Sequence, residues 1–286
     1  MGRGEVLAPI FGGQVWEMHF SSAMKLRYRD GIALYTFNNM DGWPELTQTV
    51  FGRVGGVSEP PFDSLNASFA VQDDPERVRA NRELMARAVG WDPSRIVSAG
   101  QVHGDRAVAV TRRDAGAPDL PATDALVTNE AGVLLLLKFA DCVPILLWDP
   151  VKRVVGLAHA GWRGTVRHTP AAALELMARS FGSSPSDVLV GIGPSIGPCC
   201  YDVGPDVVAE AGREFAGVDV LLRDGSERVR FDLWTANAET LMRQGVPEEN
   251  IVVAGICTRC NSDLFFSHRA AGGRTGRFAV VAGLRE

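Results

Sequence analysis

Three side chains that can bind a metal or act as nucleophiles lie where apolar runs meet loops marked by glycine or proline. They are His103, Cys142 and His159. Two imidazoles and one thiolate suit zinc, and three protein ligands leave the fourth tetrahedral position for water or substrate, which is typical of a catalytic site. The spacing is too long for a zinc-finger motif. A buried cysteine beside two hydrogen-bonded histidines is therefore the alternative interpretation.

The same cysteine could instead attack a substrate. Only a few per cent of an ordinary thiol is thiolate near neutral pH, so a nucleophilic Cys142 would need His159 or His103 as its base. Metal binding and nucleophilic attack compete for one sulfur, and the sequence leaves both open. Asp141 directly precedes Cys142, and neighbouring residues on a strand point to opposite faces. We therefore interpret Asp141 as a supporting carboxylate.

Arginines beside glycines are candidate ligands for a phosphate or carboxylate. Arg163 is flanked by glycines and precedes a predicted helix start, where backbone N–H groups also favour an anion. The glycine-rich segment 52–58 contains Arg53 and Ser58, and such loops let backbone N–H groups close on an anion. A solvated arginine and a plain surface turn are the alternatives.

The other four cysteines form no recognisable motif. Cys257 and Cys260 make a single Cys-x-x-Cys pair, which would be half of a zinc ribbon or a redox site. Cys199 and Cys200 are adjacent and supply no second half, so we interpret Cys257 as packing in the core. Five cysteines in a chain of this length are no disulfide framework and predict a reducing compartment.

The predicted elements place the candidate residues at the ends of strands. The apolar runs 143–147 and 155–160 are short and bounded by turn residues, as buried neighbouring strands are. Capping and stop signals predict helices at 74–88, 169–182, 205–215 and 232–244. Strands outnumber helices without strict alternation, which predicts an α+β fold with a mixed central sheet.

Length and composition are those of a soluble globular protein. The chain has 286 residues, 46% hydrophobic and 22% charged, and we predict a weakly specified leader at 1–28 and one catalytic domain at 29–286. A net charge of −5 without a lysine or arginine block predicts neither a nucleic-acid nor a membrane partner. Lys138 and Asp141 interrupt the longest apolar segment, well short of a membrane span of about 20 residues. We expect a cytoplasmic protein and a monomer.

Several ordered sequence blocks together resemble the laccase-domain family, whose bacterial members are also called YfiH- or YlmD-like proteins and purine nucleoside phosphorylases. The match extends from about Phe51 to the C-terminus. Its blocks are 52–58 (GRVGGVS), 64–66 (SLN), 81–82 (NR), 101–104 (QVHG), 140–144 (ADCVP), 159–165 (HAGWRGT), 193–194 (GP), 200–204 (CYDVG) and 266–269 (FSHR). The chain departs from the usual family pattern after Asn66, at 67–71, so the shape of one cavity wall is not carried over.

The resemblance implies a fold, a metal and an activity. The fold is a mixed β-sheet sandwich with flanking helices, related to cysteine-hydrolase-like toxins. The metal is zinc, held by His103, Cys142 and His159, with copper as a possible substitute in the same site. The activity is phosphorolysis of purine nucleosides (adenosine, inosine, guanosine and methylthioadenosine), with adenosine deamination as a side activity. Zinc would orient the nucleoside or activate water for deamination.

Roles for individual residues follow from the same resemblance. The residues predicted to bind substrate or phosphate are Arg53, Ser58, Asn66, Gln101 and Arg163. The residues predicted to be catalytic are Cys142, His159 and Asp141, and Asp141 is the nearest candidate for a general acid.

The word laccase in the family name can be tested by counting histidines. A four-copper oxidase needs about ten imidazole ligands and a cysteine, and the whole chain has five histidines. The sequence therefore excludes a multicopper oxidase. Two other classes stay open: a cysteine-dependent amide hydrolase with Cys142 as nucleophile, acting on a cell-wall precursor, and a non-catalytic nucleoside-binding protein.

Overall fold

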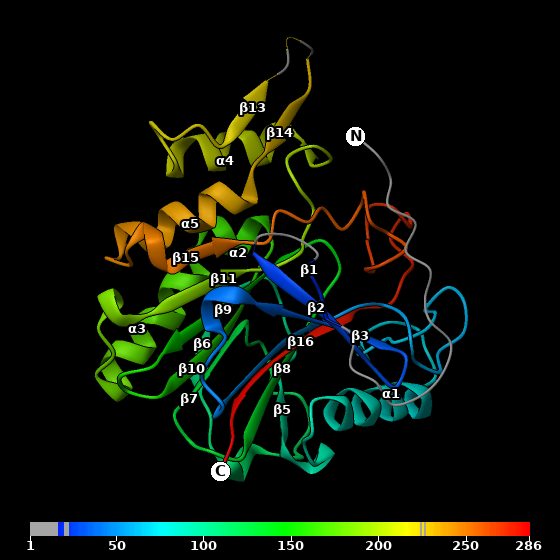
Figure 1. Ribbon diagram of the computed structural model, residues 1–286. Coiled ribbons are helices and arrows are strands. Elements are labelled where there is room, and N and C mark those ends of the chain that lie inside the picture. The colour runs from blue at the N-terminus through cyan, green and yellow to red at the C-terminus, as the bar shows by residue number, and fades with distance from the viewer. Residues whose placement is uncertain (1–16, 20–22, 224, 226) are drawn as a thin grey trace.

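Two β-sheets lie face to face at the centre of the molecule, and helices cover both outer faces (Figure 1). The structure is a computed structural model that describes residues 17–19, 23–223, 225 and 227–286. It confirms the α+β class and the mixed pairing predicted from the sequence. Within these described residues, no helix is long and apolar enough to cross a lipid bilayer.

The strands form two large sheets and one small one. The seven-stranded sheet has the order β1 (Glu17–His19), β2 (Met24–Arg29), β3 (Ile32–Phe37), β4 (Leu46–Phe51), β16 (Phe278–Leu284), β8 (Val133–Phe139), β5 (Ile96–Ser98). The six-stranded sheet has the order β15 (Ile251–Val253), β11 (Leu189–Ile192), β9 (Val143–Asp149), β10 (Val154–Ala160), β7 (Ala125–Thr128), β6 (Ala107–Ala109). The small sheet, near the top of Figure 1, has the order β12 (Asp202–Val203), β14 (Val229–Phe231), β13 (Leu221–Arg223).

Four of the helices lie where the sequence predicts them. The helices are α1 (Pro75–Ala88), α2 (Trp162–Val166), α3 (Thr169–Phe181), α4 (Pro205–Glu214) and α5 (Leu233–Arg243). The Asp74 carboxylate caps α1 by accepting the N–H of Glu76, and Asp232 caps α5 in the same way. Gly182 ends α3 in the left-handed region, at a φ of 74°. The short helix α2 is the one that the periodicity did not predict.

Side chains alternate along the central strands between two cores. On β8, Val133 and Leu135 face the six-stranded sheet, whereas Leu134 packs on the side of α1. On β10, Leu157 faces the seven-stranded sheet, whereas Ala158 packs on the side of α3 and α5. Because both faces of these strands are buried, their sequences are nearly unbroken apolar runs. A polar residue at a strand end can therefore project between the two sheets.

The segment predicted as a leader, residues 1–28, overlaps the first sheet. Most of β2 lies within it, and β2 pairs antiparallel with β3, with Leu26 opposite Tyr35. β1 pairs in turn with β2. Residues 1–16 and 20–22 of the predicted leader lie outside the described residues. The single catalytic domain over 29–286 stays a prediction.

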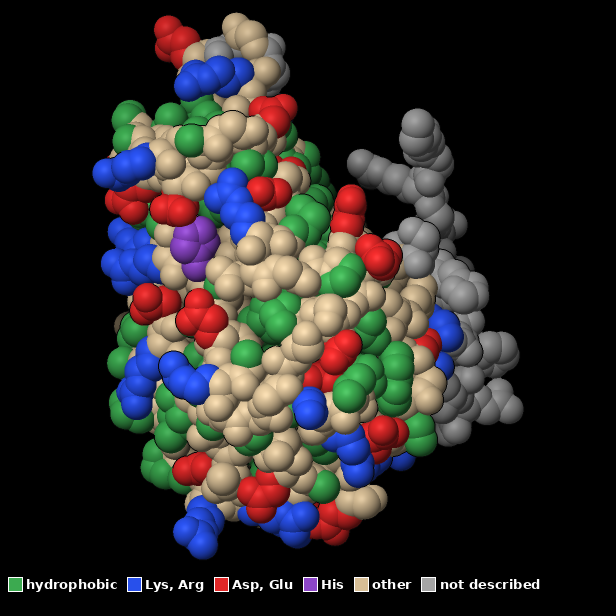
Figure 2. Space-filling view, turned by 90° about the vertical axis from the view of Figure 1, so that its left-hand side faces the viewer, with side chains coloured by type: hydrophobic (Ala, Val, Ile, Leu, Met, Phe, Trp, Pro, Cys, Tyr) green, Lys and Arg blue, Asp and Glu red, His purple; other side chains and the backbone are tan. Residues whose placement is uncertain are grey.

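Charged side chains are mixed on the surface shown in Figure 2. Lysine and arginine lie among aspartate and glutamate on that face, with hydrophobic side chains between them. Neighbouring opposite charges largely cancel at a distance, so this face has no field of a single sign.

Candidate metal centre and active site

His103, Cys142 and His159 come together at one end of the sandwich. Their ligand atoms all lie within 4.8 Å of one another. The pairing of β9 with β10 explains part of this convergence, because Ala160 lies opposite Val143. The residue before β9, Cys142, is thereby brought beside the end of β10, which carries His159. His103 comes from the loop between β5 and β6.

The strand alternation turns His159 toward the space between the sheets. Leu157 faces the seven-stranded sheet, and two residues later His159 points the same way and lies 5.4 Å, centroid to centroid, from the Phe139 ring. β7 runs antiparallel beside β10 with Ala125 opposite Ala158, so the residue before β7, Asp124, lies next to His159. The His159 Nδ1 atom is 2.8 Å from the Asp124 Oδ1 atom. This contact leaves Nε2 of the imidazole for a metal or for the Cys142 thiol.

The buried carboxylate of Asp124 also fixes the loop that carries His103. It accepts the backbone N–H groups of Val102, His103 and Gly104 at 3.1, 3.0 and 2.8 Å. Burial would raise the pKa of Asp124, but the bonds from His159 and from these N–H groups lower it, so the carboxylate is ionised. His103 itself is in the left-handed region, at a φ of 61°. Asp124 therefore holds two of the three candidate ligands in place.

The Cys142 and His159 side chains are hydrogen-bonded, and each shifts the pKa of the other. Burial alone would raise the pKa of the Cys142 thiol, but the charge of His159 and hydrogen bonds with both histidines lower it to about 6. Burial would lower the pKa of His159, but the charge of Cys142 and the hydrogen bond to Asp124 raise it to about 9. The pair therefore exists near neutral pH as thiolate and imidazolium. A thiolate is the form of cysteine that binds metals and attacks electrophiles.

Gly161 lets the three ligands approach one another. A Cβ atom at this position would lie 2.8 Å from the Cys142 Sγ atom and 3.0 Å from the His103 Cδ2 atom. Any larger residue would push the sulfur or the imidazole away. The glycine that precedes Trp162 in the sequence is thus required by the ligand cluster, and it also begins α2 as its N-cap.

The donor set fits a catalytic metal ion. Two imidazoles and a thiolate suit zinc and also suit copper, and a carboxylate bound to the second nitrogen of a ligating histidine is the usual support. Three donors would leave one position of a tetrahedral metal ion free, and all three residues line the cavity described next. The group can therefore hold a metal and present it to a substrate.

A cavity of about 450 Å³ opens beside the three ligands, which is large enough for a small organic substrate. Its basic lining side chains are Lys138, Arg163, Arg269 and Arg277. The other lining residues are Ser68, Ala70, Gly100, Gln101, His103, Asp119, Ala140, Asp141, Cys142, His159, Gly161, Trp162, Ile196, Tyr201, Leu233 and His268. The combination of aromatic, hydroxyl and guanidinium groups can bind a flat ring and an anion side by side.

Three of the other predicted site residues line this cavity: Gln101, Asp141 and Arg163. The Gln101 side chain bonds both the N–H and the carbonyl of Lys138, at 3.0 and 2.8 Å. Asp141 is at a φ of 81°, so the strand rule of opposite faces does not apply to it. The guanidinium of Arg163 lies 4.4 Å from the centroid of the Trp162 ring.

The remaining predicted residues, Arg53, Ser58 and Asn66, are not among the described residues that line the cavity. The Arg53 guanidinium donates to backbone carbonyls of Asp63 and Ser262.

Ser58 and Asn66 also make hydrogen bonds within the protein next to the 52–58 loop. The Ser58 hydroxyl and the Asn66 amide both donate to the Asp73 carboxylate, at 2.6 and 2.8 Å. Together with Arg53, these side chains hold segment 52–66 in shape.

Several site residues were missed by the sequence analysis. Asp124 gave no signal beyond its place as the first residue of a predicted strand, 124–128; in the structure it directly precedes β7. Arg269 stands in the sequence block 266–269 but was given no role, and nothing in the local sequence indicates that Arg277 faces the cavity. Lys138 was noted only as an interruption of an apolar run; its ammonium group bonds Asp119 at 2.8 Å inside the protein.

The chain is similar to known proteins over most of its length. The sequence model of the family described as "Multi-copper polyphenol oxidoreductase laccase" matches residues 47–285. The purine nucleoside phosphorylase YlmD of Bacillus subtilis is 41% identical over 240 residues, 81% of this chain and 86% of that protein. Adenosine deaminase RL5, from an unknown prokaryotic organism, is 35% identical over 82% of this chain and 91% of that protein. The crystal structure of YlmD from Geobacillus stearothermophilus matches with a TM-score of 0.84 and 39% identity, over 90% of this chain and 97% of that one. The fold implied by the sequence blocks is confirmed.

Replacing Asp124 by asparagine should weaken metal binding about 10- to 100-fold, because the amide cannot support His159 as a carboxylate does. The affinity is measured by zinc titration against a competing chelator. Asp105→Asn, on the exposed part of the same loop, is the matched control and should change the affinity less than about twofold. Equal affinities of the Asp124→Asn variant and the parent would show that the carboxylate does not support the metal site.

The buried Lys138 should make stability depend on pH. Burial lowers the pKa of Lys138 to about 8, and the Asp119 carboxylate opposes this only in part. Between about pH 8 and 10.5 the unfolded chain holds a proton that the folded chain does not, so stability rises with pH. Relative to Lys138→Met, the parent should gain a few kcal/mol of unfolding free energy over this range in urea titrations. The difference in unfolding free energy between the parent and the exposed Lys152→Met variant should stay constant over this range. A difference between the parent and Lys138→Met that also stays constant would contradict the shift.

Proposed function

The chain belongs to the multi-copper polyphenol oxidoreductase laccase family, and from this premise we propose that it is a metal-dependent purine nucleoside phosphorylase. The observation that carries the proposal is one cavity in which the cluster of His103, Cys142 and His159 lies beside several basic side chains. The Bacillus subtilis relative is named purine nucleoside phosphorylase YlmD, and this name supports the proposed activity. The oxidase chemistry in the family name does not extend to this chain, whose five histidines are too few for four coppers.

We place the phosphate at Arg163, Arg269 and Arg277 rather than in the 52–58 loop. These three guanidinium groups line the cavity, and guanidinium binds phosphate oxygens with two parallel hydrogen bonds. Arg269 is positioned by Tyr201, whose ring centroid lies 5.3 Å from the guanidinium carbon, and by Asp141, which accepts the backbone N–H of Arg269 at 2.7 Å. Arg53, Ser58 and Asn66 then support the cavity from outside rather than touching the phosphate.

Asp141 has a positioning role in this proposal. Both of its oxygens accept hydrogen bonds, one from the Thr258 hydroxyl at 2.6 Å and one from the backbone N–H of Arg269. Both oxygens are thereby engaged by donors of the protein itself. We therefore propose that Asp141 holds the phosphate-binding arginine instead of acting as the general acid.

The reaction exchanges two bonds at the ribose. A phosphate oxygen bonds to the anomeric carbon while the bond from that carbon to the purine nitrogen breaks, and the base leaves with the electron pair and takes up a proton. Zinc bound by His103, Cys142 and His159, with copper as the substitute, would supply a Lewis acid there. The arginines hold the phosphate next to the anomeric carbon. This positioning makes the step effectively unimolecular.

Adenosine deamination is proposed as a side activity of the same cavity. Water adds to the ring carbon that bears the amino group, and ammonia leaves. The relative named adenosine deaminase RL5 supports this activity. Adenosine, inosine, guanosine and methylthioadenosine are the proposed purine substrates.

Phosphate-dependent base release tests the main proposal. The protein should release hypoxanthine from inosine and adenine from adenosine only when phosphate is present, as measured by chromatography. Arg269→Gln should raise the KM for phosphate at least about tenfold, because a charged hydrogen bond contributes about 1.5–3 kcal/mol. The exposed Arg167→Gln is the matched control. A larger rise in Arg53→Gln than in Arg269→Gln would place the phosphate in the 52–58 loop instead.

One observation favours a second candidate, a cysteine-dependent amide hydrolase. Cys142, His159 and Asp124 stand in contact in the order of nucleophile, base and orienting carboxylate, and the thiol pKa is lowered to about 6. A cell-wall precursor is the substrate proposed for such an enzyme.

Two inhibitors separate the candidates. A metal-dependent phosphorylase should lose at least about 90% of its base release in excess chelator and regain it on zinc addition. Iodoacetamide should act slowly on the metal-loaded protein, because the metal covers the Cys142 sulfur. Hydrolysis that survives chelation and is abolished by alkylation would favour the cysteine nucleophile. A melting temperature raised by inosine without any turnover would indicate a binding protein.

A further inference from the structure

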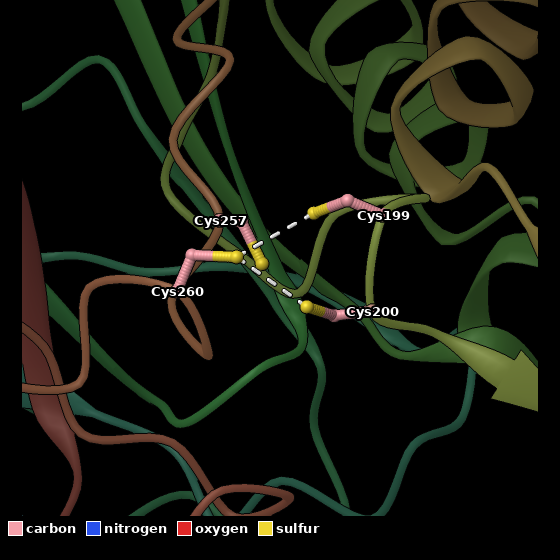
Figure 3. Close-up of side chains that lie close together, drawn as sticks. All are labelled: Cys199, Cys200, Cys257 and Cys260. Atoms are coloured by element: carbon pink, nitrogen blue, oxygen red, sulfur yellow. Dashed lines mark hydrogen bonds between the residues drawn. The ribbon is translucent and has the colours of Figure 1, made fainter. Parts of the chain in front are cut away.

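A second cluster of metal-binding side chains lies outside the cavity. The Sγ atoms of Cys199, Cys200, Cys257 and Cys260 are all within 4.8 Å of one another, and Figure 3 shows the four side chains pointing toward a common centre. The Sγ atom of Cys260 lies 3.4 Å from that of Cys200 and 3.7 Å from that of Cys199. All four are free cysteines.

The sulfur separations match a single tetrahedral metal ion. Four thiolates bound at about 2.3 Å around one zinc ion lie about 3.8 Å apart, the edge of that tetrahedron. A disulfide requires sulfurs at about 2.0 Å. The observed separations of 3.4 and 3.7 Å are therefore those of ligands around one ion rather than of a bonded pair.

The sheet topology brings the two halves of this cluster together. β11 and β15 are parallel neighbours, with Val190 opposite Ile251, so the loops that follow them leave from the same edge of the sheet. The first loop carries Cys199 and Cys200 and the second carries the Cys-x-x-Cys pair. The sequence alone shows no second half for that pair because strand pairing is not visible in it. Cys257 is buried as expected, but its sulfur belongs to this cluster.

Backbone hydrogen bonds hold both loops in the shape that the cluster needs. Gly197 donates its N–H to the Cys257 sulfur at 3.2 Å, as amides do to metal-bound thiolates. The N–H groups of Cys200 and Tyr201 both donate to the Gly197 carbonyl, which makes a turn in which adjacent cysteines can face the same side. Asn261 bonds the Cys257 carbonyl through its backbone and its side chain, at 3.0 and 2.8 Å. The loops are thus ordered around the sulfurs.

We propose that Cys199, Cys200, Cys257 and Cys260 bind one zinc ion that has a structural role. Four thiolates satisfy zinc completely and leave no position for a substrate, which is the pattern of a structural site. Several irons with bridging sulfides need more room between the cysteines than this cluster has. The inference does not depend on the proposed function, because it rests on a separate set of residues.

The zinc would stabilise one wall of the substrate cavity. Tyr201 directly follows Cys200 and lines the cavity. Thr258 directly follows Cys257 and donates its hydroxyl to Asp141 at 2.6 Å. An ion that joins the two loops would therefore fix Tyr201 and Thr258, which contact Arg269 and Asp141.

The experiment compares metal content in a background that lacks the first metal site. Cys142→Ala, whose missing cysteine lies outside the cluster, should retain one zinc per chain by elemental analysis after anaerobic, reducing purification. Adding Cys199→Ser and Cys260→Ser, the two exposed cluster cysteines, should reduce this to none and lower the melting temperature. Cobalt-substituted Cys142→Ala should show the strong visible absorption of a tetrahedral thiolate site. This measurement is independent of whether the triple variant folds.

Two results would overturn the proposal. One is a Cys142→Ala protein that contains no stoichiometric metal and gives no thiolate absorption with cobalt. The other is a disulfide between two cluster cysteines in protein kept under reducing conditions, detected by mass spectrometry. Neither result bears on base release by the parent protein, so the structural zinc and the proposed activity are tested separately.

Discussion

The candidate site depends on one buried charge, the carboxylate of Asp124. A carboxylate without exposed area is costly unless every oxygen is bonded, and here three backbone N–H groups and the His159 imidazole supply the partners. This requirement fixes the backbone around His103 and the orientation of His159 at the same time. Two of the three candidate ligands, His103 and His159, are therefore held in place by the protein itself, and such preorganisation favours tight binding of a ligand.

The sandwich determines where such a charge can be placed. Side chains between the sheets are apolar along the whole of β8, β9 and β10, and polar groups occur only where these strands end. His159 and Cys142 occupy those ends, on the face that is otherwise filled by Leu157 and Trp148. The site thus lies at the end of the core between the sheets, where His159 and Cys142 occupy positions that apolar side chains fill elsewhere along the strands. A low local dielectric follows from this position and strengthens both the ion pair and the binding of anions.

The sequence was sufficient to single out the three candidate ligands that the structure brings together, and insufficient for their partners. His103, Cys142 and His159 each stand at a boundary between an apolar run and a loop, which is a local signal. Asp124 and Arg269 act through contacts with residues far along the chain, and only strand pairing and loop packing bring those contacts about. The helices were predictable because their capping residues are local. The β11–β15 pairing, which joins two cysteine loops, carries no local signal at all.

The glycine-rich segment 52–58 shows why residue type alone is an uncertain guide to ligand binding. Glycines, an arginine and hydroxyls are what an anion-binding loop requires, yet the same groups can satisfy the loop's own backbone. Arg53 does so: it donates to two carbonyl groups and lies 4.7 Å from the centroid of the Phe266 ring. A guanidinium with its donors used in this way has few left for phosphate. Arg163 instead has its charge over Trp162 at the cavity wall, where its donors can reach a substrate. The difference lies in the partners of each arginine, and partners are a property of the fold.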